Sequence, residues 1–354
     1  MENKGIIRKI LMLVLLLTTL FIVFLGKPFK NKILGFLDGD ISIKAVNKID
    51  ASNVQDIDFI SDILIIKGNE DIKAYDIDGA MVWSKDRGGN KNYYIGNDAI
   101  YESENKGNYV KAYNNKGKEI WNISKLDPID KTIESNGGIF AITKTDNGFD
   151  KLILIDKDGN LISNCVFENE SIIGAYYNED SFCATTLNIE NEELKSTMYH
   201  YDLNGKLLWE VTFKNQIIAK VSFLSDRDTL ILSDEKIMRY NKDKLLWSKE
   251  FEGILKDAEI ADGIYLLFNN SKDFVESIDF NGKTQYKNSL NIEGDSIFSS
   301  NRDIFIIGDK ILVGYDNNKG SNEYIMNDKI EDFAYNDRYV ALLSSGTISI
   351  ISIK

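Results

Sequence analysis

The stretch VKAYNNKGKEIW (110–121) decides the fold, because its pattern returns along most of the chain. It contains an apolar-rich segment, a turn that ends in Gly117, and an aromatic residue four positions later, Trp121. Asp or Asn in such a turn bonds to the turn's own backbone, and Gly adopts the positive φ that the turn needs. The stretch therefore predicts a β-hairpin.

Copies of this hairpin recur at a regular spacing. The clearest copies are IKAYDIDGAMVW (72–83) and YHYDLNGKLLW (199–209). The anchor positions of all copies are Gly79, Gly117, Gly159, Gly205, Asp243, Gly282 and Gly320, which are separated by 38, 42, 46, 38, 39 and 38 residues. A period of about 40 residues with several short strands per unit is typical of a β-propeller. Helical repeats need a period of 3.6 residues, which these segments lack.

The repeats predict an all-β, eight-bladed propeller. Seven units run from 54 to 327, and the segments 330–336, 339–345 and 347–353 supply three strands of an eighth. The segment DISIKAVNKI (40–49) is a strand with no blade of its own. We therefore expect it to complete the last blade and close the ring. A seven-bladed ring with an additional hairpin is the alternative.

An aromatic residue follows the turn in six of the units. We expect these residues to pack between neighbouring sheets, with carbohydrate stacking as the alternative. They are Trp83, Trp121, Trp209, Trp247, Tyr286 and Tyr324.

The N-terminal part of the chain is strongly apolar. Residues 10–26, ILMLVLLLTTLFIVFLG, form an uncharged run of 17 residues. A helix of this length spans about 25 Å, and Arg8 and Lys9 can snorkel to the interface. A cleaved signal peptide is the alternative, but no small-x-small cleavage site follows the run. We expect a short cytoplasmic N-terminus (1–9), one transmembrane helix (10–26), a linker (27–38) and an extracytoplasmic propeller (39–354).

The chain is acidic, and most of the negative charge belongs to the propeller. The net charge of the 354 residues is −13, from 42 basic and 55 acidic side chains. The first 32 residues hold six of the basic and one of the acidic residues, which leaves 36 basic and 54 acidic residues, or −18, for 33–354. Such a domain repels nucleic acid and anionic polymers. We expect no nucleic-acid partner.

The pattern A-Y-x-x-x-G-K-x-x-W in VKAYNNKGKEIW resembles the repeat of quinoprotein-like propellers. That group includes the dehydrogenases that depend on pyrroloquinoline quinone (PQQ) and an outer-membrane assembly lipoprotein. The whole chain resembles an uncharacterised family of membrane-anchored propellers from Gram-positive anaerobes. The resemblance implies a propeller over roughly 40–353. The dehydrogenases use adjacent cysteines beside the quinone, whereas Cys165 and Cys183 are 18 residues apart here. We expect two buried free thiols and no cofactor.

No catalytic, cofactor-binding or metal-binding residue is assigned. His200 is the only histidine, which excludes multi-histidine zinc sites, and we expect it to be structural. The fragments Asp76-x-Asp78-Gly79 and Asp156-x-Asp158-Gly159 resemble parts of calcium loops but lack the EF-hand spacing, so we interpret them as hairpins.

Three surface features remain open. Asn191-Glu192-Glu193 lies in a connection (188–196) that is either a recognition loop or a solvated acidic loop. In each of the pairs Tyr93-Tyr94 and Tyr176-Tyr177, we expect one ring at a sheet interface and the other facing solvent or a partner.

The expected function is that of a non-enzymatic protein-binding or scaffold module on the outer face of the cell membrane, with a protein partner in the cell envelope. A carbohydrate-active hydrolase that uses two carboxylates in the central channel is the first alternative. A sensor that passes ligand occupancy to a membrane partner is the second. The sequence does not identify a small-molecule or glycan ligand.

Overall fold

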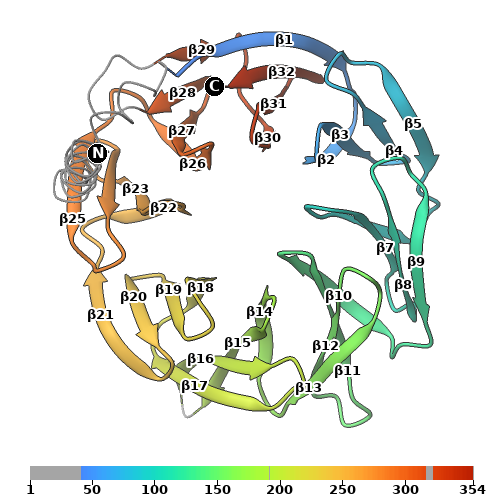
Figure 1. Ribbon diagram of the computed structural model, residues 1–354, viewed down its shortest axis with the longest axis vertical. Coiled ribbons are helices and arrows are strands. Elements are labelled where there is room, and N and C mark those ends of the chain that lie inside the picture. Colours follow the sequence, from blue (N-terminus) through green and yellow to red (C-terminus); the bar gives the residue numbers. More distant parts are fainter. Residues whose placement is uncertain (1–40, 191, 316–321, 354) are drawn as a thin grey trace, which may run out of the picture. The chain divides into compact units, whose positions relative to one another are not determined.

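Each repeated unit folds into a four-stranded antiparallel sheet, and eight such sheets surround a common axis (Figure 1). The computed structural model describes residues 41–190, 192–315 and 322–353. Ile43–Ile353 form one compact unit. The prediction of an all-β, eight-bladed propeller is confirmed, and the seven-bladed alternative is wrong.

The strands of blades 1 to 4, given from the inner to the outer edge of each sheet, have the following bounds. Blade 1 contains β2 (Val54–Ile60), β3 (Ile63–Gly68), β4 (Asp71–Tyr75) and β5 (Met81–Asp86). Blade 2 contains β6 (Lys91–Ile95), β7 (Ile100–Glu104), β8 (Tyr109–Tyr113) and β9 (Glu119–Ser124). Blade 3 contains β10 (Ile129–Ser135), β11 (Gly138–Lys144), β12 (Asp150–Ile155) and β13 (Leu161–Phe167). Blade 4 contains β14 (Ser171–Asn178), β15 (Ser181–Glu190), β16 (Glu193–Asp202) and β17 (Leu207–Lys214).

Blades 5 to 8 follow the same order. Blade 5 contains β18 (Ile218–Phe223), β19 (Asp228–Ser233), β20 (Lys236–Asn241) and β21 (Lys244–Glu250). Blade 6 contains β22 (Ile254–Ile260), β23 (Ile264–Asn269), β24 (Phe274–Ile278) and β25 (Thr284–Ser289). Blade 7 contains β26 (Gly294–Ser300), β27 (Asp303–Gly308), β28 (Ile311–Tyr315) and β29 (Glu323–Ile325). Blade 8 contains β30 (Asp332–Tyr335), β31 (Tyr339–Ser344), β32 (Thr347–Ile353) and β1 (Ile43–Asp50).

Blade 8 joins the two ends of the propeller. β1 pairs antiparallel with β32, from Ile43 opposite Ile353 to Asp50 opposite Thr347. The pairing continues past the strands, since the Ala51 N–H donates to the Gly346 carbonyl at 2.8 Å. The expectation that the early strand completes the last blade is therefore confirmed, and backbone hydrogen bonds close the ring.

The core consists of apolar layers between neighbouring blades. Between blades 8 and 1, Ile49 of β1 packs with Ile57 and Phe59 of β2 and with Ile348 of β32. Similar clusters separate blade 1 from 2, 2 from 3, 3 from 4, 4 from 5, 5 from 6 and 6 from 7. Each sheet thus buries both faces, which is why its strands are rich in Ile, Leu, Val and Phe.

Tryptophans of the outer strands join blades 1, 2 and 5 to the hairpin of the next blade. The Trp83 indole N–H donates to the Asn115 carbonyl at 2.7 Å, and Trp121 donates to the Lys157 carbonyl at 2.8 Å. Trp247 makes the same bond to the Phe280 carbonyl at 3.0 Å. The expected packing of these aromatic residues between sheets is confirmed for the three tryptophans.

Glycine in the hairpin makes room for the tryptophan. A Cβ atom on Gly159 would lie 2.7 Å from the Trp121 ring, and one on Gly117 would lie 2.9 Å from the Trp83 ring. Both glycines have a positive φ, 83° and 72°. The repeat motif is therefore a contact between blades as well as a turn.

Blade 3 departs from this scheme, because its outer strand has Ser163 where blades 1, 2, 4 and 5 have tryptophan and blades 6 and 7 have tyrosine. In blade 8, Asn47 stands at this place beside Gly79. A Cβ atom on Gly205 of blade 4 would lie 2.4 Å from the Ser163 hydroxyl oxygen. The serine thus faces the next hairpin with a much smaller side chain.

A histidine–cysteine pair is buried between blades 4 and 5. Cys183 and His200 are both fully buried, with Sγ 3.1 Å from Nδ1. The imidazole stacks on Trp209 with ring centroids 4.7 Å apart. Burial lowers the pKa of His200 to about 4 and raises that of the Cys183 thiol. Cys165 is also buried and unbonded to Cys183, so the expectation of two buried free thiols is confirmed.

The segment expected to cross the membrane, 10–26, lies outside the described residues, as do 1–9 and 27–38. In the part of the chain that is described, no helix has the length and apolar character needed to span a bilayer.

The contact between blades can be separated from backbone strain by two substitutions in blade 3. Gly159→Ala and Gly148→Ala place alanine at nearly equal φ, 83° and 82°, but a Cβ on Gly148 meets nothing within 4 Å. We expect Gly148→Ala to lower the free energy of unfolding by about 1 to 2 kcal/mol through backbone strain alone. Gly159→Ala should cost about 1 to 3 kcal/mol more, through the clash with Trp121. Urea unfolding followed by tryptophan fluorescence measures both, and equal losses would contradict the contact.

Burial of neutral His200 makes stability depend on pH. The folded pKa lies below the ordinary 6.5, so the unfolded chain binds the proton first and stability falls as the pH drops from 6.5 to 4. A difference between 6.5 and about 4 corresponds to about 3 kcal/mol. We expect His200→Phe, which keeps a ring on Trp209, to remove this part of the dependence. Urea unfolding at pH 4.5 and 7.5 gives the comparison; parallel pH profiles for the two proteins would contradict it.

Candidate binding site

Carboxylates gather on the inner strands around the axis. They are Asp56 and Asp58 of β2, Glu134 of β10, Asp257 and Glu259 of β22, and Asp332 of β30. Several accept hydrogen bonds that connect blades. The Asp257 carboxylate accepts the Ile297 N–H of blade 7 at 2.9 Å, and Glu259 accepts the Ser299 hydroxyl. These acids thus satisfy polar groups at the inner edges of the sheets, where strands have no further neighbour.

Asp58 is the most perturbed of the inner acids. Burial raises its pKa to about 6, and the nearby charges of Asp56, Glu134 and Asp332 act in the same direction. The Phe59 N–H, which donates to Asp58 at 2.7 Å, acts against them. Burial also raises the pKa values of Glu134 and Asp332. Glu134 accepts the Gly137 N–H at 3.0 Å, so its carboxylate is likewise engaged with the backbone.

Another acid, Glu102 of β7, lies away from the inner strands, in the space between blades 1 and 2. It is fully buried. Its oxygens accept bonds from Tyr93 at 2.6 Å, Tyr113 at 3.0 Å, Tyr109 at 3.2 Å, and Lys85 and Lys91 at 3.1 Å each. Burial alone would raise the pKa of Glu102, but the tyrosine and lysine donors lower it to about 2. A satisfied buried carboxylate of this kind joins the blades and leaves no room for a ligand.

The corresponding space between blades 2 and 3 is open. Lys111 of β8 and Ile153 of β12 occupy equivalent positions, two residues before the pairs Tyr113–Glu119 and Ile155–Leu161. In blade 2 the position carries an ion pair, Lys111 to Glu119 at 3.9 Å. In blade 3 the same two positions hold Ile153 and Leu161. The side chains of Ile153 and Leu161 are shorter than those of Lys111 and Glu119, and a groove remains beside them.

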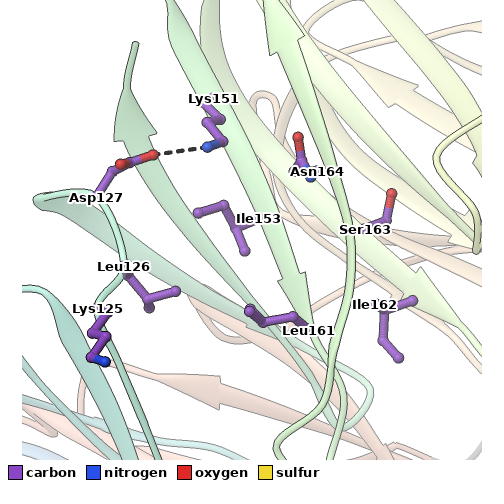
Figure 2. Close-up of a pocket in the computed structure, with 9 residues that line it drawn as sticks. All are labelled: Lys125, Leu126, Asp127, Lys151, Ile153, Leu161, Ile162, Ser163 and Asn164. Carbon is purple, nitrogen blue, oxygen red and sulfur yellow. Dashed lines mark hydrogen bonds and ion pairs between the residues drawn. The ribbon is translucent and has the colours of Figure 1, made fainter. Parts of the chain in front are cut away.

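Figure 2 shows this groove, which we call the blade 2–3 groove. Its volume is about 280 Å³. It is lined by Lys125, Leu126, Asp127, Lys151, Ile153, Leu161, Ile162, Ser163 and Asn164. Lys151 forms an ion pair with Asp127 at 2.8 Å on one side, and Leu126, Ile153 and Leu161 form an apolar floor (Figure 2). A wider space of about 560 Å³ lies between blades 6 and 7, beside Tyr315 and Glu323.

Exposed apolar side chains follow the outer circumference. We call them the apolar rim: Val46, Met81, Val82, Ile120, Leu161, Leu207, Leu208, Leu245 and Leu246. All except Val46, which lies in the closing strand β1, come directly after a hairpin turn. Blades 6 and 7 interrupt the rim with Gln285 and Glu323 at the same position. Because the rim skips two blades, the fold itself does not require it. An exposed apolar surface of this kind is typical of an interaction site.

The remaining sequence expectations have mixed outcomes. Asp156 accepts the Asp158 and Asn160 N–H groups at 2.9 and 2.8 Å, and Asp76 accepts the Ala80 N–H at 2.8 Å, as hairpin residues do. Tyr93 is buried and Tyr94 exposed, as expected.

Two expectations in blade 4 are wrong. Tyr176 donates to the Ala219 carbonyl of blade 5, while Tyr177 packs on Gly138 of blade 3, so both rings lie at interfaces. The segment 188–196 is not a long loop, because β15 and β16 continue to a tight turn where Glu190 pairs with Glu193. The polar residues that the sequence suggested formed a loop, such as Asn188 and Glu190, are instead paired with β16.

Neither His200 nor the cysteines approach a surface where a substrate could reach them. Within 41–190, 192–315 and 322–353, no group of three or more His, Cys, Asp or Glu residues is arranged to hold a metal ion. The Glu102 cluster and the blade 2–3 groove were missed by sequence reasoning. Alignment of the repeats gives a signal for the groove, since LISNCVF (161–167) lacks both the tryptophan and the charges of its counterparts.

Comparison with solved structures identifies similar folds at very low sequence identity. BamB from Moraxella catarrhalis matches with a TM-score of 0.60 and 10% identity over 88% of this chain and 100% of its own. The computationally designed protein Ika8 matches with a TM-score of 0.64 and 12% identity over 87% and 99%. The Pan2 WD40 domain of Neurospora crassa matches with a TM-score of 0.50 and 10% identity over 88% and 95%. These likenesses establish the propeller fold alone.

The sequence matches none of the curated proteins with which it was compared. One family model covers residues 39–352, almost the whole propeller and its closing strand. The chain therefore belongs to a family of unknown function, DUF5711.

Proposed function

We propose that this protein is a membrane-anchored, extracytoplasmic propeller that binds a protein of the cell envelope and acts as a scaffold rather than as an enzyme. The apolar rim carries the proposal. It places large apolar side chains in water at two adjacent repeated positions on the outer strands, and is interrupted in blades 6 and 7. A surface of this size and regularity is stabilised when a partner covers it.

The fold supports the same function. A closed ring of rigid sheets presents many exposed edges and loops without a conformational change, which suits recognition of proteins. BamB and the Pan2 WD40 domain share this architecture. The inner acids, by contrast, are occupied by backbone N–H groups and a serine hydroxyl, as Glu134, Asp257 and Glu259 show.

The proposed membrane anchor is supported by the sequence of the N-terminal part of the chain. The uncharged run 10–26 with Arg8 and Lys9 before it supports a single membrane span, with residues 1–9 inside and the propeller outside. The A-Y-x-x-x-G-K-x-x-W repeat supports a relation to quinoprotein-like blades, and the resemblance of the whole chain to membrane-anchored propellers of Gram-positive anaerobes supports the anchor.

The proposed topology is tested by protease protection. In protoplasts that express the full-length protein with a tag at either end, we expect added protease to remove a C-terminal tag and to leave an N-terminal tag intact. The reason is that a single span at 10–26 separates the two ends. A tagged cytoplasmic protein serves as the control for lysis. Protection of the C-terminal tag would overturn the extracytoplasmic location.

The scaffold function is tested by photo-crosslinking in cells. A photoreactive amino acid is placed singly at Met81, Val166, Leu246 or Ile325 of the full-length protein, all of which are exposed and lie on four different outer strands. We expect one dominant protein adduct from at least one position, identified by mass spectrometry. Absence of any specific adduct at all four positions, together with turnover of a glycan by the purified full-length protein, would favour the hydrolase instead.

A further inference from the structure

One outer strand lacks the protection that the others have. All eight outermost strands lie in the described part of the chain, and β13 (LISNCVF) is the only one without a charged residue. An outermost strand presents unpaired N–H and C=O groups, and proteins usually guard such edges with charged side chains or proline. β13 has neither, so its edge is open to pairing with another strand.

Apolar side chains are exposed at both ends of the same strand. Leu161 is 57% exposed and Val166 is 46% exposed. β13 is hydrogen-bonded on one side only, to β12, with Phe167 opposite Asp150 and Leu161 opposite Ile155. An added strand would therefore find backbone partners along β13 and exposed apolar side chains near both of its ends.

The blade 2–3 groove runs beside this edge. Leu161, Ile162, Ser163 and Asn164 of β13 form one wall of the groove, as Figure 2 shows. Small-molecule pockets usually measure about 300 to 1,000 Å³. A groove of about 280 Å³ fits one or two side chains of a peptide better than a whole cofactor or sugar chain.

The charge at the groove selects for a carboxylate. Lys125 is exposed, and among the described residues no carboxylate lies within ion-pair distance of it. Lys151 stands on the other wall, where Asp127 offsets its charge. The groove thus carries one excess positive charge on a domain whose net charge is −18 by sequence. An acidic residue in the partner would be attracted here and repelled from most of the remaining surface.

We propose that β13 accepts an extended segment of a partner protein as a fifth strand of blade 3. The segment places an apolar side chain in the blade 2–3 groove and a carboxylate beside Lys125. This mode of recognition gives affinity through backbone hydrogen bonds and specificity through the pocket for alternate side chains. The inference rests on the proposed protein-binding function and names its site and the chemistry of its partner. A second copy of this chain is the poorer occupant, because two domains of charge −18 would repel each other.

The test starts from a library of seven-residue peptides displayed on phage and selected on the full-length protein in nanodiscs. We expect enriched peptides to alternate apolar and polar residues and to contain Asp or Glu. The best peptide, made synthetically, should bind at least tenfold more weakly to Val166→Lys, which adds a guarding charge to the edge. Ile254→Lys on β22, which is 73% exposed and lies outside the apolar rim, is the control and should change binding by less than twofold. N-methylation of alternate peptide amides should abolish binding if the backbone pairs.

The role of Lys125 is tested by charge reversal. Lys125→Glu should weaken binding of the acidic peptide at least fivefold and strengthen binding of a peptide with Lys in place of its acidic residue. Binding that is indifferent to Val166→Lys or to N-methylation would overturn the proposal. So would no enrichment of peptides, or a sedimenting dimer that Val166→Lys dissociates, since a second copy would then occupy the edge.

Failure of this inference can be told apart from failure of the scaffold function. An envelope protein that crosslinks from Met81, Leu246 or Ile325 but not from Val166 leaves the scaffold intact and removes β13 as its site. Crosslinks from Val166 that map to an extended apolar–acidic segment of the partner support both.

Discussion

Every sheet of this protein is apolar on both faces, and this constraint governs the rest of the structure. A sheet with two apolar faces needs a neighbour on each side, and only a closed ring gives all eight sheets two neighbours. The pairing of β1 with β32 supplies the last contact, since it completes blade 8 and lets Ile49 join Ile57, Phe59 and Ile348 between the first and last blades. Without it, blades 1 and 8 would each expose a face as apolar as any in the interior. The first and last strands of the propeller therefore have to pair for all eight sheets to be covered on both faces.

The ring could be predicted from the sequence because the motif that specifies each blade is short and recurs along the chain. Asp or Asn, Gly and Trp stand at fixed offsets within a dozen residues, and each copy supports the interpretation of the next. The unpaired strand at 40–49 and the incomplete last unit favoured eight blades over seven, and the pairing of β1 with β32 decided between them. The motif also implies the contact of Trp121 with the following hairpin, since most units have glycine at the place of Gly159, where φ is positive and a Cβ would meet the ring.

The contents of the spaces between blades could not be predicted in this way. Glu102 is bonded by Tyr93, Tyr109, Tyr113, Lys85 and Lys91, and which of these side chains face one another depends on register across two sheets. The alternation of apolar and polar residues assigns each side chain to one face of its sheet. It does not show whether the neighbouring sheet presents a hydrogen-bond donor to that side chain. The same uncertainty explains the errors in blade 4. The polar segment 188–196, which the sequence suggested was a loop, is paired as part of β15 and β16. Tyr176 and Tyr177 each contact a neighbouring blade.

Function in a repeat protein is to be sought where the repeat is broken. Positions that obey the pattern are explained by the ring, as the tryptophans and hairpin glycines are. Blade 3 breaks the pattern three times on adjacent strands: Ser163 replaces a tryptophan, Ile153 and Leu161 replace an ion pair, and β13 carries no charge. None of these changes improves the closure of the ring, and the last exposes an edge that folded proteins usually guard. Three departures from the repeat that coincide at one place on the surface support our proposal that a partner covers that place. The same departures support our proposal that the partner binds at blade 3 rather than at the acidic axis of the ring.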